Sequence, residues 1–140
     1  MSVFEYNFEQ YKSLSPDLYR KEKYNLQVEL LKLQEDVIKK KRKIAICFEG
    51  RDTAGKSSTI NFFSEHLIPS NFNYVHLGIP TKKERKNWFE RYETYLPNKG
   101  QIVLFDRSWY TRALTEPTLG YCSKTVSYTH LTLPTNGCVV

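Results

Sequence analysis

Hydrophobic residues recur at helical spacing in the first third of the chain. Between residues 19 and 40 they lie three or four positions apart, at Leu26, Leu30, Leu33 and Val37, with charged residues between them. This period predicts an amphipathic α-helix. Ser15 followed by Pro16 is typical of a helix start, because the serine can cap the first turn and proline fits just inside it.

The pattern changes after residue 43. Residues 44–49 (IAICFE) form a short apolar run, which predicts a strand buried on both faces of a parallel sheet. Residues 73–77 and 102–105 predict two further strands. Helices are predicted over 57–66, over 81–96 with a start at Thr81 and one face made of Trp88, Tyr92, Tyr95 and Leu96, and again after Asp106. Alternating strands and helices predict one α/β domain with a mostly parallel sheet flanked by helices, preceded by the amphipathic helix.

Composition narrows the class of protein. The 140 residues carry 21 Lys+Arg against 15 Asp+Glu, a net charge of +6 that favours an anionic partner. The cysteines Cys47, Cys122 and Cys138 form no C-x-x-C pair, which favours reduced thiols in a cytoplasmic protein. The chain shows no signal peptide and no apolar run long enough to span a membrane, so we expect no membrane partner. We interpret the basic run at 39–43 as a solvated helix end rather than a nucleic-acid patch.

The loop after the first predicted strand carries a phosphate-binding motif. Residues 50–59 read GRDTAGKSST, which fits the P-loop pattern G-x-x-x-x-G-K-[ST] at Gly50, Gly55, Lys56 and Ser57. Glycines let backbone N–H groups turn toward phosphate oxygens, and the following helix points its positive end at the same anion. Lys56 adds a full charge, and the Ser57 hydroxyl can bind Mg²⁺. The preceding strand and following helix are the context that this motif requires.

The third predicted strand ends in an acid, Asp106, at the position of a Walker B aspartate that would hold Mg²⁺. Asp52 lies inside the P-loop, where a carboxylate can serve as a second metal ligand or orient an attacking phosphate. Arg51, Arg107 and Arg112 flank these positions and could carry charge in a transition state. A cationic cluster at residues 82–86 follows the second predicted strand. Together these residues indicate magnesium-dependent chemistry on a nucleotide or a polyphosphate.

Three segments together resemble the polyphosphate kinase 2 family: FEGRDTAGKSST (48–59), IPTKKERKNWFERY (79–92) and LPNKGQIVLFDRSWYTRA (96–113). The resemblance covers residues 19–124. It implies a P-loop kinase core that transfers a phosphoryl group between inorganic polyphosphate and a nucleotide, with Mg²⁺. The RSWYTRA string resembles members that use nucleoside diphosphates, and a full-length member is expected to be a homo-oligomer.

The resemblance also implies roles for individual residues. Asp52 and Asp106 would be the magnesium-binding and catalytic acids, while Lys56 and Arg107 would act in catalysis on the transferring phosphate. Ser57 and Ser58 stand where many members have glycine, which weakens the assignment of Ser57 to the metal. The residues expected to bind phosphate are Gly50, Arg51, Thr53, Ala54, Gly55, Lys56, Ser57, Ser58 and Arg112.

The end of the chain departs from the family. Family members continue with a lid and further strands, whereas residues 126–135 (VSYTHLTLPT) match the translation of a transposase-type sequencing adapter. We therefore expect residues 1–124 to be the amino-terminal part of a family domain and residues 125–140 to be a non-native tail in which His130 and Cys138 have no function. Without a lid to exclude water, we expect this chain to be inactive.

Two other functions fit part of the pattern. A nucleoside monophosphate kinase shares the P-loop core, although Asp52 and the FDRSWY string are unusual for that class. A non-catalytic module that binds phosphate or polyanions would need only the loop and the basic cluster. Nucleic acid is disfavoured as a partner, because the sequence lacks the interleaved aromatic residues on which single strands stack.

Overall fold

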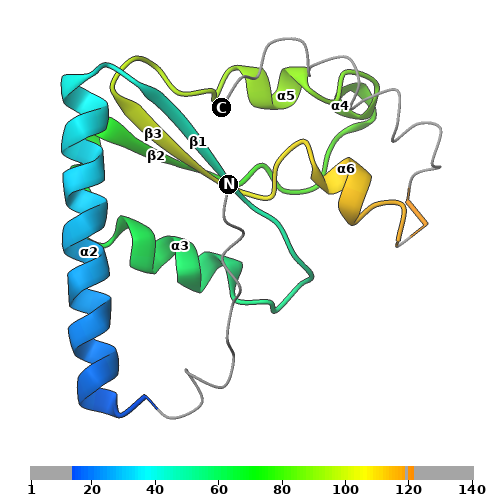
Figure 1. Ribbon diagram of the computed structural model, residues 1–140. Coiled ribbons are helices and arrows are strands. Elements are labelled where there is room, and N and C mark those ends of the chain that lie inside the picture. Colours follow the sequence, from blue (N-terminus) through cyan, green and yellow to red (C-terminus); the bar gives the residue numbers. More distant parts are fainter. Residues whose placement is uncertain (1–13, 119, 122–140) are drawn as a thin grey trace, which may run out of the picture.

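The computed structural model describes residues 14–118 and 120–121, and its elements are labelled in Figure 1. Helix α2 (Pro16–Lys39) precedes the first strand, β1 (Lys43–Phe48), and helix α3 (Lys56–Ser64) follows it. A short 3₁₀ turn (Pro69–Asn71) enters β2 (Phe72–Val75). Two short helices, α4 (Lys82–Lys86) and α5 (Glu90–Glu93), separate β2 from β3 (Gln101–Asp106), and α6 (Thr111–Leu114) comes last.

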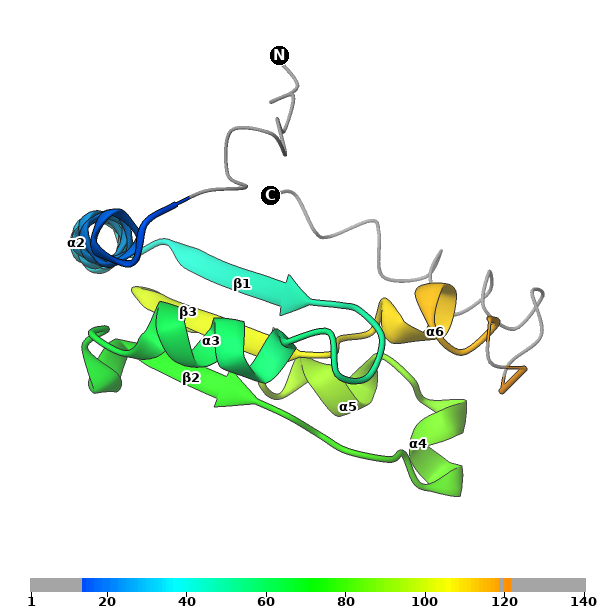
Figure 2. The ribbon, with the colours of Figure 1, turned by 90° about the horizontal axis from the view of Figure 1, so that it is seen from below.

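The three described strands form one parallel sheet in the order β1-β3-β2. Its register pairs Phe48 with Asp106 at the carboxyl ends of β1 and β3. The loop after β1 and the turn after β3 therefore leave the sheet at the same level. Figure 2 shows both segments at the end of the sheet opposite α2, which lies at the amino ends of the strands. In such sheets, ligands bind outside the carboxyl ends of the strands.

The central strand, β3, is buried on both faces, because successive side chains point to opposite sides. Around Ile102 and Leu104, one cluster receives Val37 from α2 and Ile60 from α3. The cluster on the other face is largely aromatic and comprises Val75, Trp88, Tyr92, Val103, Phe105 and Trp109. Figure 1 accordingly shows α3 and α5 on opposite faces of the sheet.

Several sequence predictions are confirmed. The expected α/β class, the parallel sheet and its three strands are present, and Ser15 caps α2 by accepting a hydrogen bond from the Leu18 amide at 3.2 Å. Thr81 begins α4 with a capping box that it forms with Glu84. A separate finding, which tests no expected partner, is that none of the helices in the described part of the chain is long and apolar enough to cross a membrane.

Two predictions need correction. The single helix expected over 81–96 is instead the two helices α4 and α5. Asn87 leaves the helical conformation at φ −110° and ψ 62°, and Trp88 turns inward, where its Nε1 atom donates to the Trp109 carbonyl at 2.8 Å. Of the expected apolar face, Tyr95 is exposed. Strand β1 is also not buried on both faces, since in the described residues it lies at the sheet edge and each of its residues is either exposed or half-buried. The predicted division at residue 124 lies outside the described residues.

Candidate active site

The loop between β1 and α3 has the conformation that its glycines permit. Gly55 directly precedes α3 at φ +84°, and Thr53 also lies in the left-handed region at φ +64°. A Cβ atom added at Gly55 would meet no atom within 4 Å, so this position favours glycine for its backbone angle rather than for lack of space. The loop therefore turns sharply into the amino-terminal end of α3, where unpaired amides favour an anion.

A hollow of about 360 Å³ opens at this turn. Its lining comes from the loop, from the first turn of α3 and from the end of β3: Asp52, Thr53, Ala54, Gly55, Lys56, Ser57, Ser58, Asp106 and Arg107. Nine of the twelve residues predicted to act in catalysis or phosphate binding thus lie around one space. The other three, Gly50, Arg51 and Arg112, do not line it.

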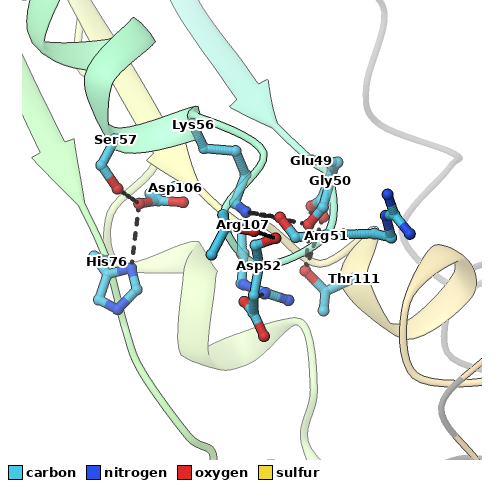
Figure 3. A network of polar contacts seen from close by, with 11 residues as sticks. Glu49, Gly50, Arg51, Asp52, Lys56, Ser57, His76, Asp106, Arg107 and Thr111 are labelled. Atoms are coloured by element: carbon cyan, nitrogen blue, oxygen red, sulfur yellow. Dashed lines mark hydrogen bonds and ion pairs between the residues drawn. The ribbon is translucent and has the colours of Figure 1, made fainter.

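Lys56 closes the loop on itself. Its ammonium group donates to the carbonyl oxygens of Gly50 at 3.1 Å and Arg51 at 2.8 Å. Figure 3 shows the Lys56 side chain extending back over the loop toward these carbonyls. The positive charge is therefore held at the rim of the hollow, within the segment that would surround an anion.

Asp106 lies at the inner wall of the hollow and is only 4% exposed. One of its oxygens, Oδ2, accepts hydrogen bonds from the Ser57 hydroxyl at 2.9 Å and the Tyr74 hydroxyl at 3.2 Å, and His76 Nδ1 lies 3.6 Å away (Figure 3). Burial and the nearby Asp106 charge raise the pKa of Tyr74. The second oxygen, Oδ1, is buried without a hydrogen-bond partner among the described residues.

That unpartnered oxygen suits a cation, because a buried carboxylate oxygen without a partner is costly. The described residues contain no group of three or more His, Cys, Asp or Glu side chains able to hold a metal. Mg²⁺ does not need one, since it is commonly bound by one or two carboxylates together with water and substrate phosphates. The donor set at Asp106 and Ser57 thus fits Mg²⁺ bound with a phosphate ligand.

Asp52 and Arg107 form an ion pair across the mouth of the hollow (Figure 3). The Asp52 side chain is almost fully exposed, at 88%, whereas Arg107 is largely buried, at 26%. In this conformation the partner of Asp52 is an arginine. An anion entering the hollow would meet the Arg107 guanidinium at its edge, and Asp52 would then be displaced or would orient the arginine.

Arg112 lies elsewhere. Its buried guanidinium pairs with Glu116 at 3.0 Å, donates to the Arg85 carbonyl at 2.9 Å and stacks 4.0 Å from the Trp88 ring. These contacts join α6 to the α4–α5 segment. The structure thus places Arg112 in a packing position, apart from the loop residues that the sequence grouped with it.

A second, larger hollow of about 570 Å³ adjoins the first and shares Asp52, Asp106 and Arg107 with it. Its remaining walls come from the β2–α4 segment, α5 and α6, including Leu77, Pro80, Arg85, Trp88, Arg91, Tyr92 and Glu116. Of the predicted basic cluster, Arg85 lines this space. The first hollow is small and polar, whereas the second offers apolar and aromatic walls of the kind that small-molecule sites use.

Comparison with known protein families identifies the relationship. The family model described as polyphosphate kinase 2 matches residues 13–132. The chain belongs to the polyphosphate kinase 2 family. It is 50% identical over 106 residues to a GDP-polyphosphate phosphotransferase of Mycolicibacterium smegmatis, and 44% identical over 111 residues to an ADP-polyphosphate phosphotransferase of Pseudomonas aeruginosa. These matches cover 75% and 79% of this chain but 38% and 36% of the relatives.

Solved structures agree with the fold. A crystal structure described as a polyphosphate kinase 2 from Pseudomonas aeruginosa PA01 superposes with a TM-score of 0.75 at 29% identity, covering 87% of this chain and 27% of that one. A polyphosphate kinase 2 from Arthrobacter aurescens TC1 gives a TM-score of 0.76 at 19% identity, covering 86% of this chain and 45% of the other. The chain thus spans about a third of the length of the curated relatives it matches.

Three further residues around this candidate site were not predicted from the sequence. Tyr74 and His76 come from the end of β2 and reach Asp106, and Glu49 binds the turn after β3. A usable signal existed for the first two. Since the carboxyl ends of parallel strands meet at one edge, polar residues ending a predicted strand beside Asp106 were candidates.

Proposed function

We propose that this chain carries the phosphate-transfer core of a polyphosphate-dependent nucleotide kinase. It would move a phosphoryl group between inorganic polyphosphate and a nucleoside diphosphate such as ADP or GDP. The observation that carries the proposal is the hollow in which residues 52–58 meet Asp106 and Arg107. Relatives named GDP- and ADP-polyphosphate phosphotransferases support this choice of substrates.

The reaction requires a terminal oxygen of the diphosphate to attack the last phosphorus of the polyphosphate chain. The new P–O bond makes a triphosphate, and the broken bond leaves polyphosphate shorter by one unit. Catalysis of such a transfer consists mainly of positioning and charge stabilisation. The α3 amino-terminal end and Lys56 would bind the transferring phosphate, and Arg107 would face its equatorial oxygens.

Asp106 would hold Mg²⁺ through Oδ1, while the Ser57 and Tyr74 hydroxyls keep its other oxygen in place. When bound, the ion would supply positive charge to the phosphate oxygens. Asp52 would leave Arg107 and turn either to the ion or to the incoming diphosphate. The magnesium requirement, a cytoplasmic location and a homo-oligomeric state stay predictions.

The test supplies polyphosphate, GDP or ADP, and Mg²⁺ with no other phosphoryl donor. We would assay the 140-residue chain and a chimera in which its matched 106-residue segment replaces the corresponding segment of the Mycolicibacterium smegmatis relative. We expect the chimera to form GTP or ATP. The Lys56→Ala variant should lose this activity, and Glu35→Ala, on an exposed face of α2, should keep it. A folded chimera that binds polyphosphate without transfer would favour a non-catalytic module. Activity with AMP and ATP alone would favour a monophosphate kinase.

A further inference from the structure

Glu49, the residue just before the loop, is bound to the turn that follows β3. Its Oε1 atom accepts from the Ser108 amide and the Ser108 hydroxyl, both at 2.7 Å. The Thr111 hydroxyl lies 3.0 Å from Oε2 and 3.3 Å from Oε1. Figure 3 shows Glu49 and Thr111 side by side, with the carboxylate turned toward α6. Both carboxylate oxygens are therefore used as acceptors by one short segment.

These contacts surround Arg107 on the chain. The Arg107 amide donates to the Phe48 carbonyl at 3.0 Å, and the next amide, that of Ser108, donates to Glu49. Between them Arg107 lies at φ +68°, a left-handed conformation that is unfavourable for a residue with a side chain. Such a conformation persists only where the surrounding structure fixes it. Here two consecutive residues, Phe48 and Glu49, hold the backbone on both sides of it.

Glu49 lines neither hollow, whereas Arg107 lines both. Its carboxylate is occupied by the hydroxyl and amide donors of Ser108 and Thr111. Any effect of Glu49 on phosphate binding must therefore pass through the backbone of the β3–α6 turn and the arginine that this turn carries.

We propose that Glu49 is a positioning residue for Arg107: it anchors the β3–α6 turn to the start of the phosphate loop, so that the guanidinium faces the hollow at a fixed distance from Lys56. This rests on the proposed function, because it assigns Arg107 to the phosphates of polyphosphate. Glu49 also links the phosphate loop to the β3–α6 turn, because it lies at the start of that loop, directly after β1, and binds the turn that follows β3.

The choice of variants follows from the hydrogen bonds. Glu49→Ala removes every acceptor for the Ser108 and Thr111 donors. Glu49→Gln keeps one acceptor oxygen for Ser108 and offers an N–H to the Thr111 hydroxyl, so it should restore much of the anchor. Glu35, exposed on α2, provides the matched control for loss of a glutamate.

The decisive experiment is a double-mutant cycle on polyphosphate affinity, measured by calorimetry on the 140-residue chain with Glu49→Ala, Arg107→Met and both changes together. If Glu49 acts through Arg107, each single variant should weaken binding about tenfold and the pair should weaken it no further than about tenfold. Glu49→Gln should recover most of the affinity, and Glu35→Ala should keep all of it.

Amide hydrogen exchange gives a second readout. In Glu49→Ala the Arg107 and Ser108 amides should exchange at least about tenfold faster, while the Leu104 amide in the centre of β3 keeps its protection. Effects that multiply to about a hundredfold in the cycle would overturn the positioning role alone. An unchanged affinity in Glu49→Ala would also overturn it. So would a Glu49→Gln variant whose affinity is no better than that of Glu49→Ala. A parent chain that binds no polyphosphate would overturn the proposed function, and this inference with it.

Discussion

Replacing Arg112 distinguishes the role that the sequence predicts for it from the position that the structure gives it. The Arg112 side chain is 5% exposed and that of its partner Glu116 is 14% exposed. Arg112→Met keeps much of the side-chain volume but removes the charge, the hydrogen bond to the Arg85 carbonyl and the stacking on Trp88. Glu116 is then left as a largely buried carboxylate with its charge unpaired.

The expected loss of stability can be estimated from these contacts. Removing one partner of a buried ion pair destabilises a protein by about 3–5 kcal/mol, and most of that comes from the charge left behind. Because the Glu116 side chain retains some solvent contact, we expect about 3 kcal/mol for Arg112→Met. Glu116→Gln in the same chain removes the stranded charge. The double variant should therefore recover about half of the loss.

The assay is urea unfolding followed by the fluorescence of the two buried tryptophans, Trp88 and Trp109, together with polyphosphate affinity. A packing role predicts lower stability with affinity changed by less than about threefold. A packing role is refuted if the stability of Arg112→Met stays within about 0.5 kcal/mol of the parent while its affinity falls tenfold or more, because Arg112 would then serve the phosphates as the sequence predicted.

Lys56, Gln34 and Tyr92 each give a further measurable expectation. Lys56→Ala should abolish transfer in the chimera, by about a hundredfold or more, and lower stability by only about 1 kcal/mol, as turnover and urea unfolding would show. Gln34→Leu should lower stability by about 2 kcal/mol in urea, because the buried amide both donates to and accepts from the backbone of Ile68. Burial raises the pKa of Tyr92 to about 12, whereas a tyrosine in the unfolded chain titrates at about 10. Because the unfolded chain loses this proton at a lower pH, the free energy of unfolding should fall by up to about 2 kcal/mol as the pH rises from about 10 to about 12. Tyr92→Phe should lose the part of this dependence that Tyr92 contributes and keep the part that comes from the raised pKa of Tyr74, whereas exposed Tyr24→Phe should keep all of it. An equal alkaline loss in all three chains would contradict the assignment.

The helices, strands and loops that were predicted correctly are those whose pattern lies in residues close together in the sequence. The Ser15 cap of α2, the buried run of β3 and the glycine-rich loop each depend on neighbouring residues, so the sequence contains their cause. The apolar period located the helix α2, but Leu26 and Leu33 of its predicted apolar face are exposed, and Val37 is buried. The break between α4 and α5 could not be predicted this way. It depends on Trp88 reaching the Trp109 carbonyl, a contact between residues 21 positions apart that overrides a continuous helical pattern.

The same distinction applies to the site. The loop and the acid at the end of β3 line one hollow, because the strand–loop–helix context fixes where each of them lies. Arg112 was grouped with them because it follows the same strand by a few residues. Its actual surroundings are set by its own stacking on Trp88, and the spacing of residues in the sequence does not predict which way the Arg112 side chain points.

Glu49 shows why a motif can be found without its supporting contacts. The P-loop pattern starts at Gly50 and describes residues that face a ligand, so it assigns no role to the preceding glutamate, although Glu49 lies within the segment 48–59 that resembles the family. Its partners Ser108 and Thr111 lie 59 and 62 positions further along the chain. They reach it only because the parallel register ends β1 and β3 together, with Phe48 opposite Asp106. The geometry of the site therefore depends on sheet register as much as on the loop. A change that shifts β1 against β3 by one residue should move Lys56 away from Arg107 even though every residue of the motif is still present in the sequence.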